Sequence, residues 1–239
     1  MSQALIVCEN RQGVRRLQIN RPQAANALDE ALHLAVQHHL NAAALDPQVQ
    51  CVVLSSAGER TFCAGADLKE FSTLAPLEAA QRRRRLLLDT LLCLIDFPKP
   101  LIAQVGGAAV GAGAMLALAC DEIVATPSAR FHFPEIDLGM ASPMGCLMVE
   151  WRAGAQVAQS MLQWGKPCIA TQAHAQAWVH DLHPADVLAQ AVWASAEQRR
   201  ASAAFAVNKQ WLHAPWRMRL LQAAETAEAA TAANNLSGN

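Results

Sequence analysis

The stretch KPLIAQVGGAAVGAGAMLALAC, residues 99–120, gives the strongest indication of the fold. The Lys-Pro pair interrupts the helical sequence before it, and the apolar run 101–105 is typical of a buried strand. Residues 106–113 are then glycine and alanine apart from Val110, and they lead into an apolar segment that we expect to be helical as far as Cys120. The stretch therefore predicts a strand, a glycine-rich turn and a helix in succession.

A second turn of the same kind lies upstream, in the sequence CAGADL at residues 63–68. It follows an apolar strand at 51–54 and a polar turn at 55–61, and it precedes a helix expected over about 79–95. Small residues let a backbone approach a ligand closely, and the N-terminus of a helix offers unpaired N–H groups. Two such turns can hold a developing negative charge, whereas one alone is better explained by tight packing of a helix on a sheet.

The flanking sequence extends this alternation of strands and helices. Apolar residues alternate with polar ones over 14–20, which predicts a strand paired with residues 4–8. Helical spacing starts at Asp29, and a further short strand is expected over 123–125. Beyond Ser142 the chain is rich in alanine and is predicted to be mostly helical. We therefore expect an α/β core over residues 1–185 and a helical segment over 186–239.

Composition excludes several classes of function. The 239 residues are 53% hydrophobic, and their formal net charge of −1 provides no overall basic field for nucleic acid or an anionic membrane. The first residues lack a secretory leader, and no apolar run is long enough to span a membrane, so a cytoplasmic location is expected. The seven cysteines are scattered without a CxxC pair, which argues against a metal site.

The order of several short motifs resembles the crotonase superfamily, also called the enoyl-CoA hydratase/isomerase family. The resemblance covers nearly the whole chain. Its landmarks are NRP at 20–22 with NAL at 26–28, residues 62–70, residues 99–113, CD at 120–121, residues 131–139, GKP at 165–167 and NKQ at 208–210. It implies a spiral of strand-strand-helix units with a helical C-terminal part.

The resemblance also implies how an acyl-CoA thioester would be held. The backbone N–H groups of Ala66 and Ala112 would form an oxyanion hole for the thioester oxygen. Coenzyme A would enter as part of the substrate, with no separate cofactor, and the chain would assemble as a homotrimer or hexamer. The residues expected to line the substrate cleft are Gln23, Ala24, Ala25, Ala64, Asp67, Leu68, Gly111 and Met115.

Two positions usually decide the chemistry in this family. Hydratases carry a glutamate on the helix after the second turn and another in a Pro-Glu segment. Here the first position is Met115 and the second is Glu135. A thioether cannot accept a proton, so the residues favour isomerisation of an enoyl-CoA by one base over hydration. An atypical hydratase (a lyase) and a CoA-ester binding protein without turnover remain alternatives. Without the motif context, an acid paired with a surface arginine would be the better interpretation of Glu135.

A run of four arginines at residues 82–85 lies within the second expected helix. A solvated helix face or a subunit contact explains it best. Binding of a CoA phosphate comes second, and a nucleic-acid patch comes third.

Overall fold

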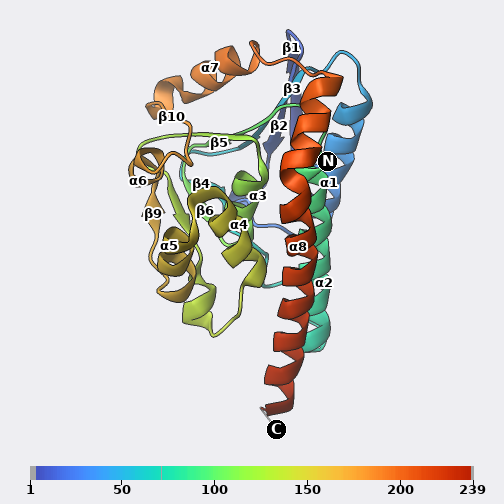
Figure 1. Ribbon diagram of the computed structural model, residues 1–239, viewed down its shortest axis with the longest axis vertical. Helices are drawn as coiled ribbons and strands as arrows, with labels where there is room; N and C mark the ends of the chain where they lie inside the picture. Colours follow the sequence, from blue (N-terminus) through green and yellow to red (C-terminus); the bar gives the residue numbers. More distant parts are fainter. Residues whose placement is uncertain (1–3, 71, 238–239) are drawn as a thin grey trace.

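The computed structural model describes residues 4–70 and 72–237, and its strands form two sheets (Figure 1). The larger sheet has six strands in the order β1-β2-β3-β5-β7-β10, and the smaller has four in the order β4-β6-β8-β9. Only the β1-β2 and β8-β9 pairs are antiparallel. The chain therefore returns repeatedly to the same edge of each sheet through crossover connections.

The crossovers form a repeating unit of two strands and a helix. In the second, third and fourth units the first strand joins the larger sheet, the next joins the smaller sheet, and a helix follows. The elements of the four units are β1 (Ile6–Arg11), β2 (Val14–Ile19) and α1 (Glu30–Leu45); β3 (Cys51–Ser56), β4 (Thr61–Cys63) and α2 (Pro76–Ile95); β5 (Leu101–Val105), β6 (Ala108–Val110) and α3 (Ala112–Ala119); β7 (Glu122–Ala125), β8 (Arg130–His132) and α4 (Pro143–Ala153).

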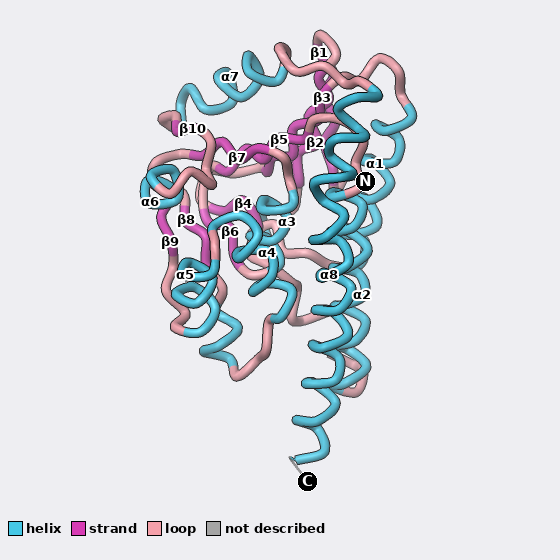
Figure 2. The backbone as a smooth tube through the Cα atoms, viewed as in Figure 1, coloured by secondary structure: helices cyan, strands magenta, loops and turns pink. Residues whose placement is uncertain are grey.

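The central strands β3 and β5 of the larger sheet are almost completely buried, and burial on both faces explains why they are largely apolar. In β3, Val52 and Leu54 belong to the main core, together with α1, α2 and α3. Cys51 and Val53 point to the other face, where they join a separate cluster with Leu188 of α7 (Ala185–Ala196). In Figure 2, α7 lies above β5 and β7, whereas α3 and α4 lie below them.

The rest of the chain is mainly helical. Its elements are the short helix η1 (Pro22–Ala24), the short helix η2 (Pro134–Leu138), α5 (Ala155–Ala158), η3 (Gln159–Gln163), β9 (Cys168–Ile169), α6 (Ala170–Ala175), β10 (Asp181–Leu182) and α8 (Ala203–Ser237). The long helix α8 lies beside α2 and α4, and its Leu220 is fully buried in the main core (Figure 1). The chain thus ends on a helix that packs against the core.

The α/β architecture with a helical C-terminal part is confirmed, and so are the strands and helices expected up to residue 125. The sequence analysis missed β4 and β6, which it assigned to a polar turn and to a glycine-rich loop. Both strands have only three residues, and β6 consists of Ala-Ala-Val, so neither shows a strand period. The boundary between residues 185 and 186 stays a prediction. It coincides with the start of α7.

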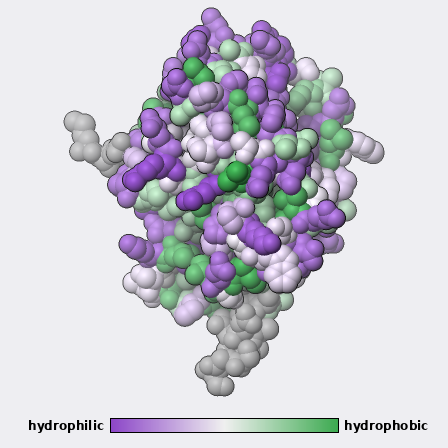
Figure 3. Space-filling model, turned by 90° about the vertical axis from the view of Figure 1, so that its left-hand side faces the viewer, coloured by the Kyte–Doolittle hydropathy of each residue, from purple (hydrophilic) through white to green (hydrophobic). Residues whose placement is uncertain are grey.

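The surface is largely hydrophilic on the side shown in Figure 3, where hydrophobic side chains form small separate groups. Such a distribution is typical of a face that contacts water. Among the helices of the described residues, none has the length and apolar character that crossing a membrane requires.

Alanine at position 113 is expected to destabilise the fold. A Cβ atom on Gly113 would lie 2.3 Å from the carbonyl oxygen of Cys63, so the backbone would have to shift. Overpacking of this kind costs about 1–3 kcal/mol, which should outweigh the helix propensity of alanine, about 1 kcal/mol in its favour. Urea unfolding of Gly113→Ala measures the loss.

Gly106→Ala is the matched control, because the nearest atom to a Cβ there is Cδ2 of Leu188 at 3.9 Å. Equal unfolding free energies for the two variants would contradict the close approach at Gly113.

Candidate active site

Two glycine-rich turns, one after β4 and one after β6, approach each other more closely than side chains would allow. A Cβ on Gly65 would lie 2.8 Å from the carbonyl oxygen of Val110 and 3.6 Å from the backbone nitrogen of Ala112. Gly65 has a φ of +92°, a conformation that favours glycine. In the other direction, Gly113 faces Cys63 at the close distance given above. The two turns therefore interlock, and each requires glycine at the contact.

The first turn presents the N–H group of Ala66. The N–H of Leu28 donates to the carbonyl of Gly65, and the N–H of Asp67 donates to the carbonyl of Leu28, both at 2.8 Å. These two bonds make a parallel bridge between Leu28 and Ala66. In a parallel bridge, the residue whose two neighbours make the hydrogen bonds directs its own N–H away from the partner segment. Here that residue is Ala66. The N–H of Ala66 therefore faces away from Leu28.

The second turn presents the N–H group of Ala112, the first residue of α3. The first N–H groups of a helix have no acceptor inside it, and the helix dipole makes this end favourable for negative charge. Gly111 before it has a φ of +50° and lets a neighbouring side chain approach. A Cβ at Gly111 would lie 2.8 Å from Oε1 of Glu135. The carboxylate of Glu135 thus packs directly against the turn that carries Ala112.

Glu135 belongs to η2, which follows β8. Its Oε2 atom is buried and has no hydrogen-bond partner within the described chain. Burial raises the pKa of the carboxyl group above its usual value, with a smaller opposing contribution from its own backbone N–H. A raised pKa makes the ionised carboxylate a stronger base, which suits a group that takes up and returns a proton.

These groups line one cavity of about 330 Å³. All three residues predicted to be catalytic, Ala66, Ala112 and Glu135, contribute to its wall. So do four of the residues predicted to bind substrate: Ala64, Leu68, Gly111 and Met115. The cavity therefore brings together residues from three different strand-strand-helix units.

The other predicted binding residues do not line this cavity. Gln23 and Ala24 belong to η1, and Ala25 follows it with a left-handed φ of 50°. The carbonyl of Ala25 accepts a hydrogen bond from the N–H of Ala64 at 3.1 Å, so this segment lies directly behind the cavity wall. The side chain of Asp67 is engaged with Arg21. A role for these four residues in binding CoA stays a prediction.

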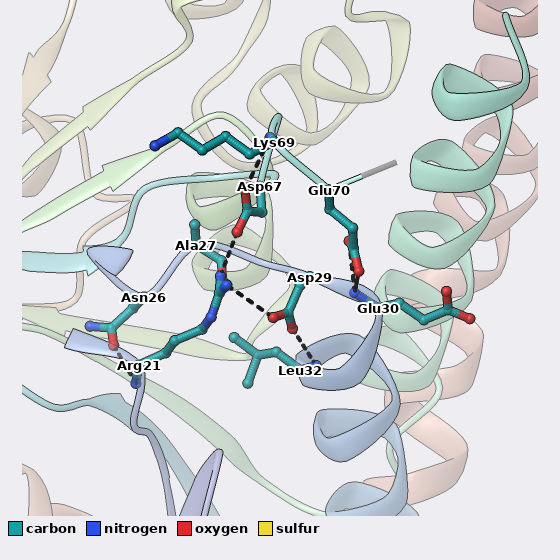
Figure 4. A network of polar contacts seen from close by, with 9 residues as sticks. All are labelled: Arg21, Asn26, Ala27, Asp29, Glu30, Leu32, Asp67, Lys69 and Glu70. Carbon is teal, nitrogen blue, oxygen red and sulfur yellow. Dashed lines mark hydrogen bonds and ion pairs between the residues drawn. The ribbon is translucent and has the colours of Figure 1, made fainter. Parts of the chain in front are cut away.

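Arg21 connects the first glycine-rich turn to the start of α1 (Figure 4). Its guanidinium group forms ion pairs with Asp29 at 3.1 Å and with Asp67 at 2.8 Å, and all three side chains are largely buried. Asp29 in turn caps α1 by accepting a hydrogen bond from the N–H of Leu32. This network fixes the turn that carries Ala66 relative to a helix of the core.

Four polar side chains that line the cavity from the helical side are not among the predicted site residues: His33, Glu70, Arg83 and Arg84. For the arginine run, the sequence favours a solvated face or a subunit contact, with a CoA phosphate second. His33 is buried, its Nδ1 lies 2.8 Å from Oγ1 of Thr90, and burial lowers its pKa to about 4, so the ring is neutral at neutral pH. Both oxygens of Glu70 accept from the backbone N–H of Glu30 at 2.9 Å. The helical phase of α1 and α2 relative to the cavity decides which side chains face it, and residue types alone do not reveal that phase.

Taken together, the residues that carry two backbone N–H groups line the cavity beside one buried carboxyl group, whose Oε2 atom has no partner among the described residues. The N–H pair can stabilise an oxyanion, and the carboxyl group can transfer a proton next to it. Such an arrangement suits enolate chemistry on a bound carbonyl compound.

Comparison with known proteins agrees with this description. The family model for enoyl-CoA hydratase/isomerase matches residues 9–236. The chain is 39% identical over 184 residues to 2,3-dehydroadipyl-CoA hydratase of Escherichia coli K12, a match that covers 76% of this chain and 70% of that protein. It is 33% identical over 193 residues to human enoyl-CoA delta isomerase 2, covering 79% of this chain and 48% of that protein.

Solved structures give the same result for the fold. A crystal structure of an enoyl-CoA hydratase/isomerase from Xanthobacter autotrophicus Py2 superposes with a TM-score of 0.84 at 29% identity, covering 97% of this chain and 87% of that one. An enoyl-CoA hydratase from Bacillus anthracis superposes with a TM-score of 0.82 at 25% identity, covering 94% and 90%. The relatives thus include both hydratases and isomerases.

Replacing Arg21 with methionine is expected to lower the free energy of unfolding by about 2–3 kcal/mol, because two largely buried carboxylates lose their partner. Urea unfolding at neutral pH measures this loss. Arg85→Met is the matched control: its pair with Asp89 is exposed and should contribute at most about 0.5 kcal/mol. If both variants lose the same small amount, Arg21 does not hold the turn.

Proposed function

The chain belongs to the enoyl-CoA hydratase/isomerase family, and we propose that it isomerises an enoyl-CoA thioester with Glu135 as its single base. The thioester oxygen would accept hydrogen bonds from the N–H groups of Ala66 and Ala112. One such donor is typically worth about 3 kcal/mol in an acyl-transfer enzyme. The hole consists of backbone, so alanine at both positions is sufficient.

The observation that carries this proposal is the pairing of Met115 with Glu135. Both residues line the cavity, and Met115 lies on α3. The family resemblance equates its position with that of the first glutamate of hydratases. Met115 is almost fully buried, and its thioether can neither hold nor deprotonate a water molecule. Glu135 therefore acts without the second carboxylate that water addition uses.

A single base is enough for an allylic shift. The ionised Glu135 removes a proton from C2 of a 3-enoyl-CoA, and the electron pair moves onto the thioester oxygen to give a dienolate. The two backbone N–H groups stabilise the negative charge of that oxygen. The carboxylic acid of Glu135 then returns the proton to C4, which yields the 2-enoyl-CoA. The proton, the electrons and the base are all restored at the end of the cycle.

Glu70 is the other carboxylate in the cavity, and we do not assign it a proton-transfer role. Both of its oxygens face the backbone N–H of Glu30 at the start of α1 (Figure 4). An anion at the N-terminus of a helix is stabilised there. Its position thus suits anchoring of the loop after the first turn.

We also propose that the protein works in the cytoplasm as a homotrimer or hexamer, in line with the family resemblance. The long helix α8 exposes Val207, Trp211 and Met218 along one face, since their spacings of four and seven residues bring them into line. An apolar stripe of this kind is suited to contact with another subunit.

Glu135→Gln is expected to reduce conversion of 3-enoyl-CoA to 2-enoyl-CoA by about 100- to 10,000-fold, because the amide cannot take up the proton. Product analysis by ultraviolet absorbance and mass spectrometry measures the loss.

Burial raises the pKa of Glu135, and only the ionised carboxylate acts as the base. The kcat/KM of the wild type should therefore fall as the pH decreases, and the fall should begin at a higher pH than it would for an exposed glutamate.

Glu59→Gln, at an exposed glutamate that is not among the residues lining the cavity, is the control and should retain full activity. Formation of 3-hydroxyacyl-CoA from 2-enoyl-CoA by the wild type would instead identify an atypical hydratase. Binding of acyl-CoA without turnover of either substrate would identify a CoA-ester binding protein.

Met115→Glu is expected to introduce hydration of 2-enoyl-CoA, since it restores a second carboxylate on the cavity wall. Met115→Gln has the same shape without the charge and should add no hydratase activity. The measurement is the rate of 3-hydroxyacyl-CoA formation by both variants and the wild type. Equal hydration by wild type and Met115→Glu would mean that Met115 does not limit water addition.

A further inference from the structure

The four consecutive arginines of α2 have different surroundings. Arg82 pairs with Glu30 of α1, and Arg85 pairs with Asp89 one turn further along α2. Arg84 lies close enough to Glu228 of α8 for the opposite charge to raise its pKa, although burial lowers it by more. Arg83 lines the cavity and makes no hydrogen bond or ion pair to the rest of the described chain.

Arg83 lies on a mainly apolar stripe of α2 that faces the cavity. Ala80 precedes it by three residues and Leu87 follows it by four, so the three side chains share one face of the helix, and all of them line the cavity. His33 of α1 and Ala227 of α8 extend this helical wall. Helices α2 and α8 run side by side here (Figure 1).

The helical wall is separate from the wall that holds the reacting atoms. The N–H groups of Ala66 and Ala112 come from the glycine-rich turns, and the residues expected to bind CoA lie on or behind those turns, between 23 and 25 and between 64 and 68. A thioester held at the N–H groups has CoA on one side and the acyl chain on the other. An acyl chain on the side away from CoA would run along the helical wall, where Arg83 lies.

Neither of the two cavity carboxylates among the described residues forms an ion pair with Arg83. Glu70 is directed at the backbone of Glu30, and Glu135 packs against Gly111. His33 is neutral and engaged with Thr90. A guanidinium group in a largely apolar cavity gains most from a partner that forms two parallel hydrogen bonds, as a carboxylate does.

We propose that Arg83 determines specificity by pairing with a carboxylate at the distal end of the acyl group, so that the preferred substrates are ω-carboxyacyl-CoA thioesters. This inference rests on the proposed function, since it places the thioester at Ala66 and Ala112. It adds the chemical class of the acyl group to that site.

Binding of unreactive, saturated thioesters tests the inference independently of turnover. The probes are succinyl-, glutaryl-, adipoyl- and suberoyl-CoA, each measured by titration calorimetry beside the saturated acyl-CoA of the same carbon number that ends in a methyl group. For at least one chain length, the wild type should bind the carboxylated member about 10- to 100-fold more tightly, the usual contribution of a charge-assisted pair.

Arg83→Met should abolish this preference while leaving the affinity for the methyl-ended thioester within about twofold, and Arg83→Lys should restore part of it. Arg85→Met is the matched control, because its pair with Asp89 is exposed, and it should bind both probes as the wild type does.

Other outcomes would overturn the inference. Equal weakening of both probes by Arg83→Met would assign Arg83 to the CoA moiety, most simply to a phosphate. Absence of a carboxylate preference at every chain length in the wild type would exclude the proposed pair. Failure of the wild type to isomerise any 3-enoyl-CoA, with the binding preference intact, would overturn the proposed function and leave the assignment of Arg83 standing.

Discussion

The close contact between the two glycine-rich turns is the constraint on which the rest of the structure depends. Gly65 lies against the carbonyl of Val110, and Gly113 lies against the carbonyl of Cys63, at distances that leave no room for a Cβ. The contact joins the second and third strand-strand-helix units. It brings one backbone N–H from each unit to the same cavity, and Glu135 from the fourth unit completes the group. The spiral is therefore the means by which three distant segments meet.

Most of the fold could be predicted from the sequence, because apolar residues in the main strands and helices recur with the spacing typical of each element. Leu32, Val36 and Leu40 mark one face of α1, and all three are fully buried in the core. Ala66, Ala112 and Glu135 were found through the order of short motifs, since nothing in their own residue types indicates a site. The structure does bring them to one cavity, as that order implied.

The features that could not be predicted from the sequence depend on tertiary contacts, which a local sequence pattern does not encode. Strands β4 and β6 exist because the smaller sheet pairs them, with Thr61 beside Ala108, and three residues are too few to show alternation. The arginine run of α2 is a similar case. Four adjacent residues point in four directions around a helix, so only the packing of α2 against α1 and α8 decides that Arg83 faces the cavity while Arg82 and Arg85 find carboxylates elsewhere.

The proposed oxyanion donors belong to the main chain, whereas the groups proposed to select the substrate are side chains on helices. This division has an evolutionary consequence. A substitution at Ala66 or Ala112 by another residue with a backbone N–H changes only the side chain. The two proposed hydrogen-bond donors to the thioester oxygen are therefore retained. Exchange of a residue on the cavity face of α2 alters which acyl group fits without disturbing the turns. New specificities can therefore arise stepwise from one inherited scaffold, each intermediate retaining its chemistry.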